Sequence, residues 1–228
     1  MNLYLWLNIF TMGTLFLSFD KKVGFYKYFK SLFLAITIVM LVFIPWDIYF
    51  TKHNYWGFTT EYLFGKFLFH LPLEEWLFFI SVPFSCTFIH YVIKAYFKNP
   101  FKINFTKPFW YILASTLLII GIFNIDQPYT FWSFILCGIC LISINYINSF
   151  FMTEFLFTYL VCLIPFFIVN SILTGSFTKS PIVFYNENCF SGIRIGTIPF
   201  EDLFYNMILI LLSTYFTELF YHLKTKKQ

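Results

Sequence analysis

The sequence contains little charge. Only 11% of its 228 residues are charged, whereas 59% are hydrophobic and the mean hydropathy is +0.74. A soluble domain of this size needs more polar surface than these residues can provide. The composition therefore excludes a soluble globular protein and predicts a chain that crosses a membrane several times.

The sequence also lacks the short motifs that bind nucleotides and metals. There is no Gly-x-Gly-x-x-Gly fingerprint, no Gly-Lys-Ser/Thr phosphate loop and no metal-ligand spacing among the histidines. Cys137 and Cys140 have the spacing of a redox pair, but they lie inside an apolar run. We therefore expect no cofactor and no metal, and we expect these two cysteines to act as packing residues.

Seven apolar runs are long enough to predict membrane-spanning helices, at about 20 residues per span. The predicted fold class is an all-α polytopic bundle of about seven spans. Pro72, Pro108 and Pro199 suit the first turn of a helix, where a missing N–H costs little. The predicted helices cover residues 3–19, 30–50, 72–97, 107–124, 130–149, 153–173 and 199–222.

Positive charge is distributed unequally between the two sides of this predicted bundle. One side carries eleven lysines, and the other carries three lysines and the only arginine, Arg194. By the positive-inside rule, the chain is a multi-pass protein of the cell (inner) membrane with its N-terminus outside and its C-terminus in the cytoplasm. The net charge of +4 is therefore a topology signal, and we expect no nucleic-acid partner.

An acidic motif occurs twice in the chain. Pro72-Leu73-Glu74-Glu75 returns as Pro199-Phe200-Glu201-Asp202, at an offset of 127 residues, and each copy opens an apolar run. Four crossings separate the copies, so both would lie at the non-cytoplasmic face. We predict two parallel three-span repeats, residues 1–100 and 129–228, joined by a linking span within residues 101–128.

Carboxyl groups at the start of apolar helices have two explanations. They can cap the first backbone N–H groups and interact with the helix dipole, or they can be functional, as acids inside a membrane usually are. A carboxyl group facing an apolar cavity holds its proton more firmly than one in water, and a neighbouring carboxylate can then accept a proton. Because both copies of the motif retain both acids, the functional explanation is favoured over capping alone.

Two basic residues near the motifs also have open interpretations. Arg194 could hold a carboxylate of the second motif in its ionised form, or it could contact lipid headgroups. His70 could tune Glu74 or relay protons, or it could be an ordinary loop histidine.

The two motifs resemble the Pro-x-Glu-Glu/Asp signature of the small membrane lycopene cyclases, and the resemblance extends over nearly the whole chain. It implies an intramolecular lyase or isomerase of carotenoid biosynthesis that converts the linear ends of lycopene to β-ionone rings, giving γ- and β-carotene. Lycopene and γ-carotene would then be its substrates. Membrane lipid would surround it, it would use no dinucleotide or flavin, and it could associate with other carotenoid enzymes.

The resemblance also implies roles for individual residues. Cyclisation needs an acid, a base and a dry pocket whose aromatic faces stabilise a cation. Glu74 and Glu201 are the leading candidates for proton donor or acceptor, with Glu75 and Asp202 as their partners. We expect the substrate pocket to include Asp47, Trp76, Phe78 and Tyr205, and Asn170 stands where the first half has Asp47.

Two functions of other classes share the same features. A proton-coupled transporter would also have repeats and intramembrane acids, although acids gathered at one end do not form a path across the membrane. A non-catalytic carotenoid-binding subunit would need the pocket but not the acids.

Overall fold

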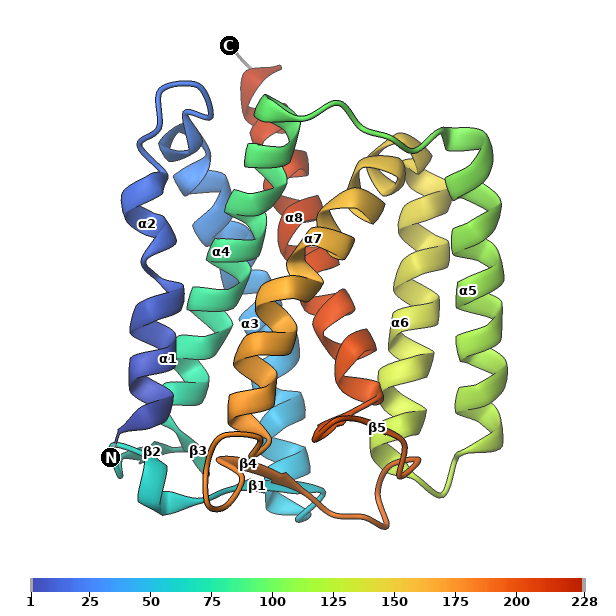
Figure 1. Ribbon diagram of the computed structural model, residues 1–228. Helices are drawn as coiled ribbons and strands as arrows, with labels where there is room; N and C mark the ends of the chain where they lie inside the picture. The colour runs from blue at the N-terminus through green and yellow to red at the C-terminus, as the bar shows by residue number, and fades with distance from the viewer. Residues whose placement is uncertain (1, 227–228) are drawn as a thin grey trace. The chain divides into compact units, whose positions relative to one another are not determined.

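The computed structural model describes residues 2–226 and confirms the predicted all-α fold class. Long helices make up most of the chain, and short strands lie in the connections between them (Figure 1). The helices of the described chain are α1 (Leu3–Thr11), α2 (Thr14–Leu17), α3 (Phe29–Lys52), α4 (Leu73–Tyr96), α5 (Ile103–Phe123), α6 (Pro128–Ile147), α7 (Ser149–Leu173) and α8 (Glu201–Thr225).

Six of the predicted spans are helices long and apolar enough to cross a membrane, counted within residues 2–226. The first apolar run differs from the prediction because it is divided between α1 and α2. These two short helices follow one another beside α4 (Figure 1). The division lies at Met12 and Gly13, and glycine is the weakest of the ordinary helix formers.

Proline positions also differ from the prediction. Pro72 and Pro199 do not lie in the first turn of a helix, since each is the last residue of a short strand just before α4 or α8. Pro108 lies inside α5, because that helix begins at Ile103, earlier than expected. Prolines inside membrane helices are tolerated when neighbouring helices and polar side chains satisfy the freed backbone groups.

Many large apolar side chains lie on the outside of the helices. Phe10 is 84% exposed, Phe16 82% and Phe123 83%. Such side chains would be unfavourable in water, but they match the hydrocarbon of a bilayer. Together with the long apolar helices, they make the chain a membrane protein.

The chain divides into two compact units. Unit 1 contains Met1–His53, Phe58–Phe97 and Leu209–Gln228, whereas unit 2 contains Asn54–Gly57 and Lys98–Ile208. Helix α8 therefore begins in unit 2 and ends in unit 1. These packing units differ from the sequence repeats, and the division into repeats and a linking span remains a prediction.

Aromatic packing forms the core of unit 1. Phe25, Leu32, Phe84, Phe88 and Tyr91 belong to one buried cluster of the helices α3 and α4 and the short turn before α3. The ring centroids of Phe25 and Phe88 are 5.4 Å apart in an edge-to-face arrangement, which is favourable for aromatic pairs. This packing holds α4, which carries the first motif.

In unit 2 a small residue brings two helices together. Helices α5 and α6 lie side by side (Figure 1). A Cβ atom added to Gly138 on α6 would lie 3.0 Å from the carbonyl oxygen of Ala114 and 2.7 Å from Leu118 on α5. Glycine permits this close backbone approach, as in many membrane helix pairs.

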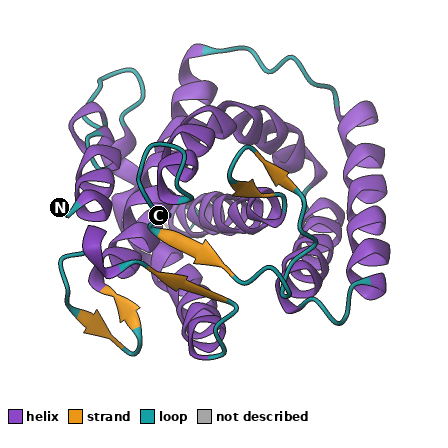
Figure 2. Ribbon diagram, turned by 60° about the horizontal axis from the view of Figure 1, so that its bottom comes forward, coloured by secondary structure: helices purple, strands orange, loops and turns teal. Residues whose placement is uncertain are grey.

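Short strands occupy the connections and form pairs outside the helices (Figure 2). β1 (Trp56–Phe58) pairs with β4 (Val183–Tyr185), and most of β1 belongs to unit 2. The remaining pairs are two hairpins, β2 (Phe67–Leu68) with β3 (Leu71–Pro72) and β5 (Arg194–Ile195) with β6 (Ile198–Pro199). Each of these hairpins leads directly into an acidic motif.

Candidate active site

The two hairpins have the same geometry at corresponding positions. In the first, Phe67 pairs with Pro72, and in the second, Arg194 pairs with Pro199. A glycine with positive φ precedes each hairpin, Gly65 at 82° and Gly192 at 76°. Positive φ is readily adopted by glycine and costly for other residues. The sequence repeat thus has a structural counterpart in the loop before each motif.

The segment just before each hairpin places a backbone N–H against the first acid of the motif. Phe64 N donates to Glu74 Oε1 at 2.5 Å, and Ser191 N donates to Glu201 Oε1 at 2.9 Å. Thr130 Oγ1 is a second donor to Glu201 Oε1, also at 2.5 Å. Both acids are fully buried, with 0% exposure. Each of these two carboxyl groups is therefore fixed through only one of its own two oxygens, Oε1.

The second oxygen of each of these carboxyl groups, Oε2, has different surroundings. Glu74 Oε2 and Glu201 Oε2 are buried and have no hydrogen-bond partner among residues 2–226. An amide N–H can only donate, so Oε1 must act as the acceptor in each site. A proton on either carboxyl group is best accommodated on Oε2, because Oε1 already accepts the amide hydrogen bond and no acceptor within residues 2–226 bonds to Oε2. This arrangement allows transfer of the proton to a bound molecule.

The second acid of the first motif is held by side chains from two other helices. Tyr4 of α1 donates its O–H to Glu75 Oε2 at 2.6 Å. The carboxyl group of Asp47 on α3 lies beside that of Glu75, and Asp47 is only 1% exposed. Three carboxyl groups, those of Asp47, Glu74 and Glu75, are thus buried within unit 1.

The second acid of the second motif receives three hydrogen bonds. Tyr129 donates to Asp202 Oδ1, while Tyr185 and Asn170 donate to Oδ2 at 2.9 and 2.8 Å. Asp202 is 4% exposed. Asn170 thus contacts the second acid of its motif from the helix that precedes the hairpin, as Asp47 does in unit 1.

Aromatic rings gather around Asp202. Tyr129 stacks on Tyr185 with centroids 5.6 Å apart, and Trp56 contacts both rings edge-on at 5.1 and 6.2 Å. Tyr205, a predicted pocket residue, lies 6.0 Å from Trp56 and 6.3 Å from Tyr129. We call Trp56, Tyr129, Tyr185 and Tyr205 the aromatic cluster. The faces of such rings attract cations.

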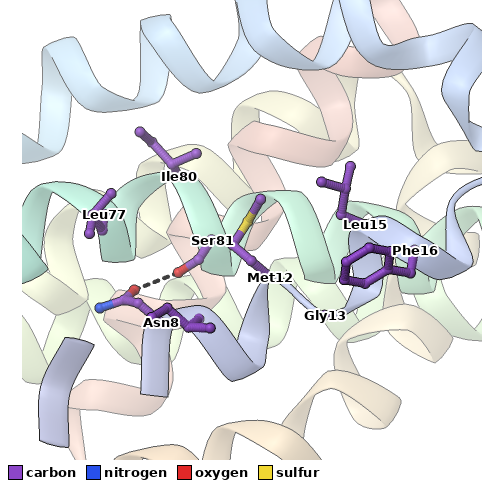
Figure 3. Close-up of a pocket in the computed structure, with 9 residues that line it drawn as sticks. Asn8, Met12, Gly13, Leu15, Phe16, Leu77, Ile80 and Ser81 are labelled. Carbon is purple, nitrogen blue, oxygen red and sulfur yellow. Dashed lines mark hydrogen bonds between the residues drawn. The ribbon is translucent and has the colours of Figure 1, made fainter. Parts of the chain in front are cut away.

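A groove of about 350 Å³ runs between α1–α2 and α4 beside the first motif (Figure 3). Its polar members are Asn8 and Ser81, and Ser81 Oγ donates to Asn8 Oδ1 at 2.6 Å. The Asn8 amide in turn donates to the carbonyl oxygen of Glu74 at 3.0 Å. The remaining lining is Ile9, Met12, Gly13, Leu15, Phe16, Leu77 and Ile80. The polar side chains are satisfied, so the groove presents an apolar surface.

Other predicted site residues lie away from the motif carboxyl groups. The guanidinium of Arg194 donates to Glu187 Oε1 and to the carbonyl oxygen of Thr197, each at 2.7 Å, and lies over Phe190. Of the ion pairs recorded in the described part of the chain, the one that Arg194 forms is with Glu187 and not with Glu201 or Asp202, contrary to one of the two interpretations. His70 is exposed at the turn of the first hairpin, with φ 70°.

The two predicted aromatic residues after the first motif have different neighbours. Trp76 donates weakly from Nε1 to the carbonyl oxygen of Leu68, at 3.4 Å, and so contacts the hairpin. Phe78 is half-buried, and its ring lies 6.5 Å from Tyr4. Phe78 is therefore adjacent to the phenol that binds Glu75.

Sequence reasoning missed the hydroxyl donors of both sites. Tyr4, Tyr129, Thr130 and Tyr185 were not singled out, because they lie on other elements, up to 73 residues from their acids. The sequence does contain a weak indication of these donors. Tyr4 and Tyr129 each lie near the start of the first helix of a predicted repeat, α1 and α6.

A separate ionic cluster occurs near the end of α4. Glu218 accepts hydrogen bonds from Lys94 and from His90 Nε2, the latter at 3.1 Å, and His90 is fully buried. Cys137 and Cys140 are free thiols on α6, and the Cys137 thiol contacts the Met207 sulfur at 3.8 Å.

Comparison with known proteins identifies relatives. The family model described as "Lycopene cyclase" matches residues 1–93 and 126–220, well over half of the chain. Three curated fungal proteins are similar, each named "Bifunctional lycopene cyclase/phytoene synthase". The match to the Phaeosphaeria nodorum protein is 30% identical over 80 residues, covering 35% of this chain and 14% of the relative.

The other two matches are similar in extent. The Leptosphaeria maculans protein is 32% identical over 66 residues, covering 29% of this chain and 11% of the relative. The Gibberella fujikuroi protein is 27% identical over 103 residues, covering 43% of this chain and 18% of the relative. The matches thus span less than a fifth of each relative. No solved structure shows significant similarity to the chain.

Proposed function

The chain belongs to the lycopene cyclase family, and from this premise we propose that it is a lycopene β-cyclase that closes the linear ends of lycopene into β-ionone rings. The observation that supports this most strongly is the pair of buried glutamates, Glu74 and Glu201, each with one oxygen fixed and the other without a hydrogen-bond partner among residues 2–226. A hydrocarbon substrate offers no polar group to bind. It can, however, accept a proton from such an oxygen.

The proposed reaction is an isomerisation. A carboxyl group protonates the terminal alkene, the resulting cation closes a six-membered ring by forming a C–C bond, and a ring carbon then loses one proton to a carboxylate. No atom and no electron is gained or lost overall, so the step needs no oxidant or reductant. In this assignment Glu74 and Glu201 exchange protons with the substrate, while Glu75 and Asp202 serve as their partners.

Surroundings of the acids fit the demands of a cationic intermediate. The aromatic cluster supplies ring faces next to Asp202, and each ring that contacts a cation contributes about 0.5–2 kcal/mol. Burial of all four motif acids keeps water away, which prevents capture of the cation. The groove beside α4 adds apolar surface of the kind that a polyene chain requires.

The test is expression of the chain in a bacterium that accumulates lycopene, followed by chromatography of its pigments. We expect γ- and β-carotene in place of lycopene. A proton-coupled transporter would leave the pigments unchanged, and a carotenoid-binding subunit would retain uncyclised lycopene on the purified chain. Either of those results, at normal levels of the chain in the membrane, would contradict the proposal.

A further inference from the structure

We propose that the groove between α1–α2 and α4 is the binding site for the polyene chain of a carotenoid whose end lies at Glu74. The ligand class is a long, stiff hydrocarbon held lengthwise along α4. The site differs from the motif acids, since none of them lines the groove. The identity of its occupant rests on the proposed function.

The groove begins within one helical turn of the first acid. Leu77 and Ser81 line it from α4 and follow Glu74 at i+3 and i+7, so the three residues share one face of the helix. Asn8 of α1 joins them: its amide donates to the carbonyl oxygen of Glu74 at 3.0 Å, and its side-chain oxygen accepts from Ser81 at 2.6 Å (Figure 3). The groove thus extends along α4 from the level of Glu74.

The opposite wall of the groove contains an interruption in an apolar helix. Leu15 N donates to the carbonyl oxygen of Met12 at 2.9 Å, whereas in a continuous α-helix it would donate to that of Thr11. The freed carbonyl oxygen of Thr11 accepts from Ser85 Oγ at 2.8 Å and from Thr14 Oγ1 at 3.1 Å. Side chains therefore stabilise the break between α1 and α2.

This interruption lies beside the middle of a membrane-spanning helix. Ser85 follows Leu73 by 12 residues in the 24-residue helix α4, about 18 Å along its axis. At such a depth, irregular backbone is tolerated where protein protects it or where it lines a cavity, and interrupted helices form the binding sites of many membrane transporters. Met12, Gly13 and Phe16, at the break and just after it, line the groove. The break thus contributes to a cavity wall.

The second half has an equivalent pair of helices, α6 and α8. Tyr129 near the start of α6 donates to Asp202, as Tyr4 near the start of α1 donates to Glu75. However, α6 is one continuous helix of 20 residues. The interruption is therefore particular to the first half.

The facing surfaces of α6 and α8 pack directly against each other. The ring centroids of Phe134 and Phe204 are 5.0 Å apart, and Cys137 Sγ lies 3.8 Å from Met207 Sδ. Phe204 follows Glu201 by three residues, as Leu77 follows Glu74, yet Phe204 is 8% exposed and Leu77 is 39% exposed. The groove is therefore not a general consequence of the repeat.

The lining of the groove fits a stiff apolar ligand. Its volume of about 350 Å³ lies within the range of about 300–1,000 Å³ that ligand pockets have. Asn8 and Ser81 bond to each other, so they leave an apolar surface. A phospholipid acyl chain is the competing occupant. A conjugated polyene is already extended, so it loses less conformational freedom on binding than a flexible acyl chain does.

Photo-crosslinking identifies the occupant directly. A diazirine-bearing amino acid replaces Leu77, and the purified full chain is irradiated in lipid nanodiscs that contain lycopene. Mass spectrometry of the labelled peptide should show an adduct with the mass of the carotenoid. The same amino acid at Leu41, which is 71% exposed on α3 and outside the groove, should form phospholipid adducts.

Filling the groove provides a second measurement. With cyclase activity present, Leu77→Trp and Ile9→Trp should each raise the KM for lycopene about tenfold and leave kcat little changed, because they remove binding surface and not the acids. Leu41→Trp is the matched control and should leave both constants unchanged. Melting temperatures identify any variant that fails to fold.

Two outcomes in folded protein would overturn the proposal: phospholipid adducts at position 77 in the presence of lycopene, or an unchanged KM in both groove variants. Crosslinking does not require turnover, so it separates the two proposals. A carotenoid adduct without ring-containing product would support the groove and contradict the proposed function. Ring-containing product with phospholipid adducts at position 77 would support the proposed function and contradict the groove.

Discussion

At the scale of single residues, the two acids of each motif differ in how they are held. Glu74 and Glu201 are each bound through one oxygen by a backbone amide, whereas Glu75 and Asp202 are enclosed by hydroxyl, amide and carboxyl groups. The first acid of each motif thus leaves one oxygen available to react with a substrate, whereas the hydrogen bonds of the second acid hold the site together.

We therefore predict that Glu74→Gln and Glu201→Gln each nearly abolish cyclisation. An amide cannot donate a carboxylic proton or act as the base, and a general acid or base contributes about 10²–10⁴-fold to a rate. Turnover of lycopene by purified variants is the measurement, with Asp126→Asn as the matched exposed control. Near-normal turnover in either glutamine variant would remove that residue from the mechanism.

The phenols around Asp202 give a second prediction. Tyr129→Phe removes one donor but keeps the ring in the aromatic cluster. A hydrogen bond to a charged group contributes about 1.5–3 kcal/mol, so we expect turnover to fall by about tenfold to a hundredfold. Tyr146→Phe is the control, because Tyr146 is 83% exposed. Equal activities of the two variants would show that the bond to Asp202 has no catalytic importance.

The four motif acids could be predicted from the sequence because the repeat keeps both acids at a constant offset. Their donors could not be predicted in the same way. Tyr4 lies 71 residues from Glu75, and Tyr129 lies 73 residues from Asp202, so each contact depends on the packing of different helices. Arg194 is the converse case. It lies seven residues before Glu201, but its guanidinium donates to Glu187, which precedes it by seven residues and is 69% exposed.

At the scale of secondary-structure elements, each hairpin fixes the start of the following helix. Leu73 N donates to the carbonyl oxygen of Lys66 at 3.0 Å, and Phe200 N donates to that of Ile193 at 2.9 Å. These bonds connect the loop to the first residues after each proline. The hairpin therefore sets the position of both the glutamate and the amide that binds it.

This role leads to a prediction for the glycines before the hairpins. Gly65→Ala and Gly192→Ala place a side chain at positive φ, which costs about 1–2 kcal/mol although no atom lies within 4 Å of the new Cβ. The adjacent amides of Phe64 and Ser191 should move with the strained turn. We expect a lower melting temperature and a loss of turnover larger than the loss of folded protein.

Gly24→Ala is the matched control, measured by the same melting and turnover assays. Gly24 also has positive φ, 57°, but it lies in the turn before α3 and is not next to a motif. It should lower the melting temperature to a similar extent without affecting the activity of the folded fraction. If it impaired turnover as strongly as the motif glycines, the hairpins would have no special role.

The helices themselves were largely predictable, because a long apolar run in a membrane has few structures other than a helix. Helix ends and breaks were less predictable. α5 begins five residues before Pro108, and the first run is broken near Gly13, since local turn geometry and packing decide these points. The strands β2 and β5 were expected only as parts of loops, and β3 and β6 each end on a proline that was expected to begin a helix. Two-residue strands leave no hydrophobic period to detect.

At the scale of the whole molecule, the distribution of lysines predicts the direction of insertion. Both motifs should lie at the non-cytoplasmic face, and the C-terminal tail should lie in the cytoplasm. A fluorescent protein fused to the C-terminus should therefore fluoresce. Cysteines introduced at exposed loop positions Lys66 and Glu187, in a chain without its native cysteines, should react with an impermeant thiol reagent from outside. Labelling only after the membrane is broken would contradict this topology.

The central claim is that buried carboxyl groups cyclise lycopene by adding one proton and removing another. The most direct measurement is mass spectrometry of the carotenoid formed when the purified chain, equilibrated in D₂O, acts on lycopene in lipid vesicles. The donating carboxyl group exchanges its proton for a deuteron between turnovers, so we predict one deuterium in each new ring. Ring-containing product without deuterium, or lycopene left uncyclised by folded protein, would contradict the account.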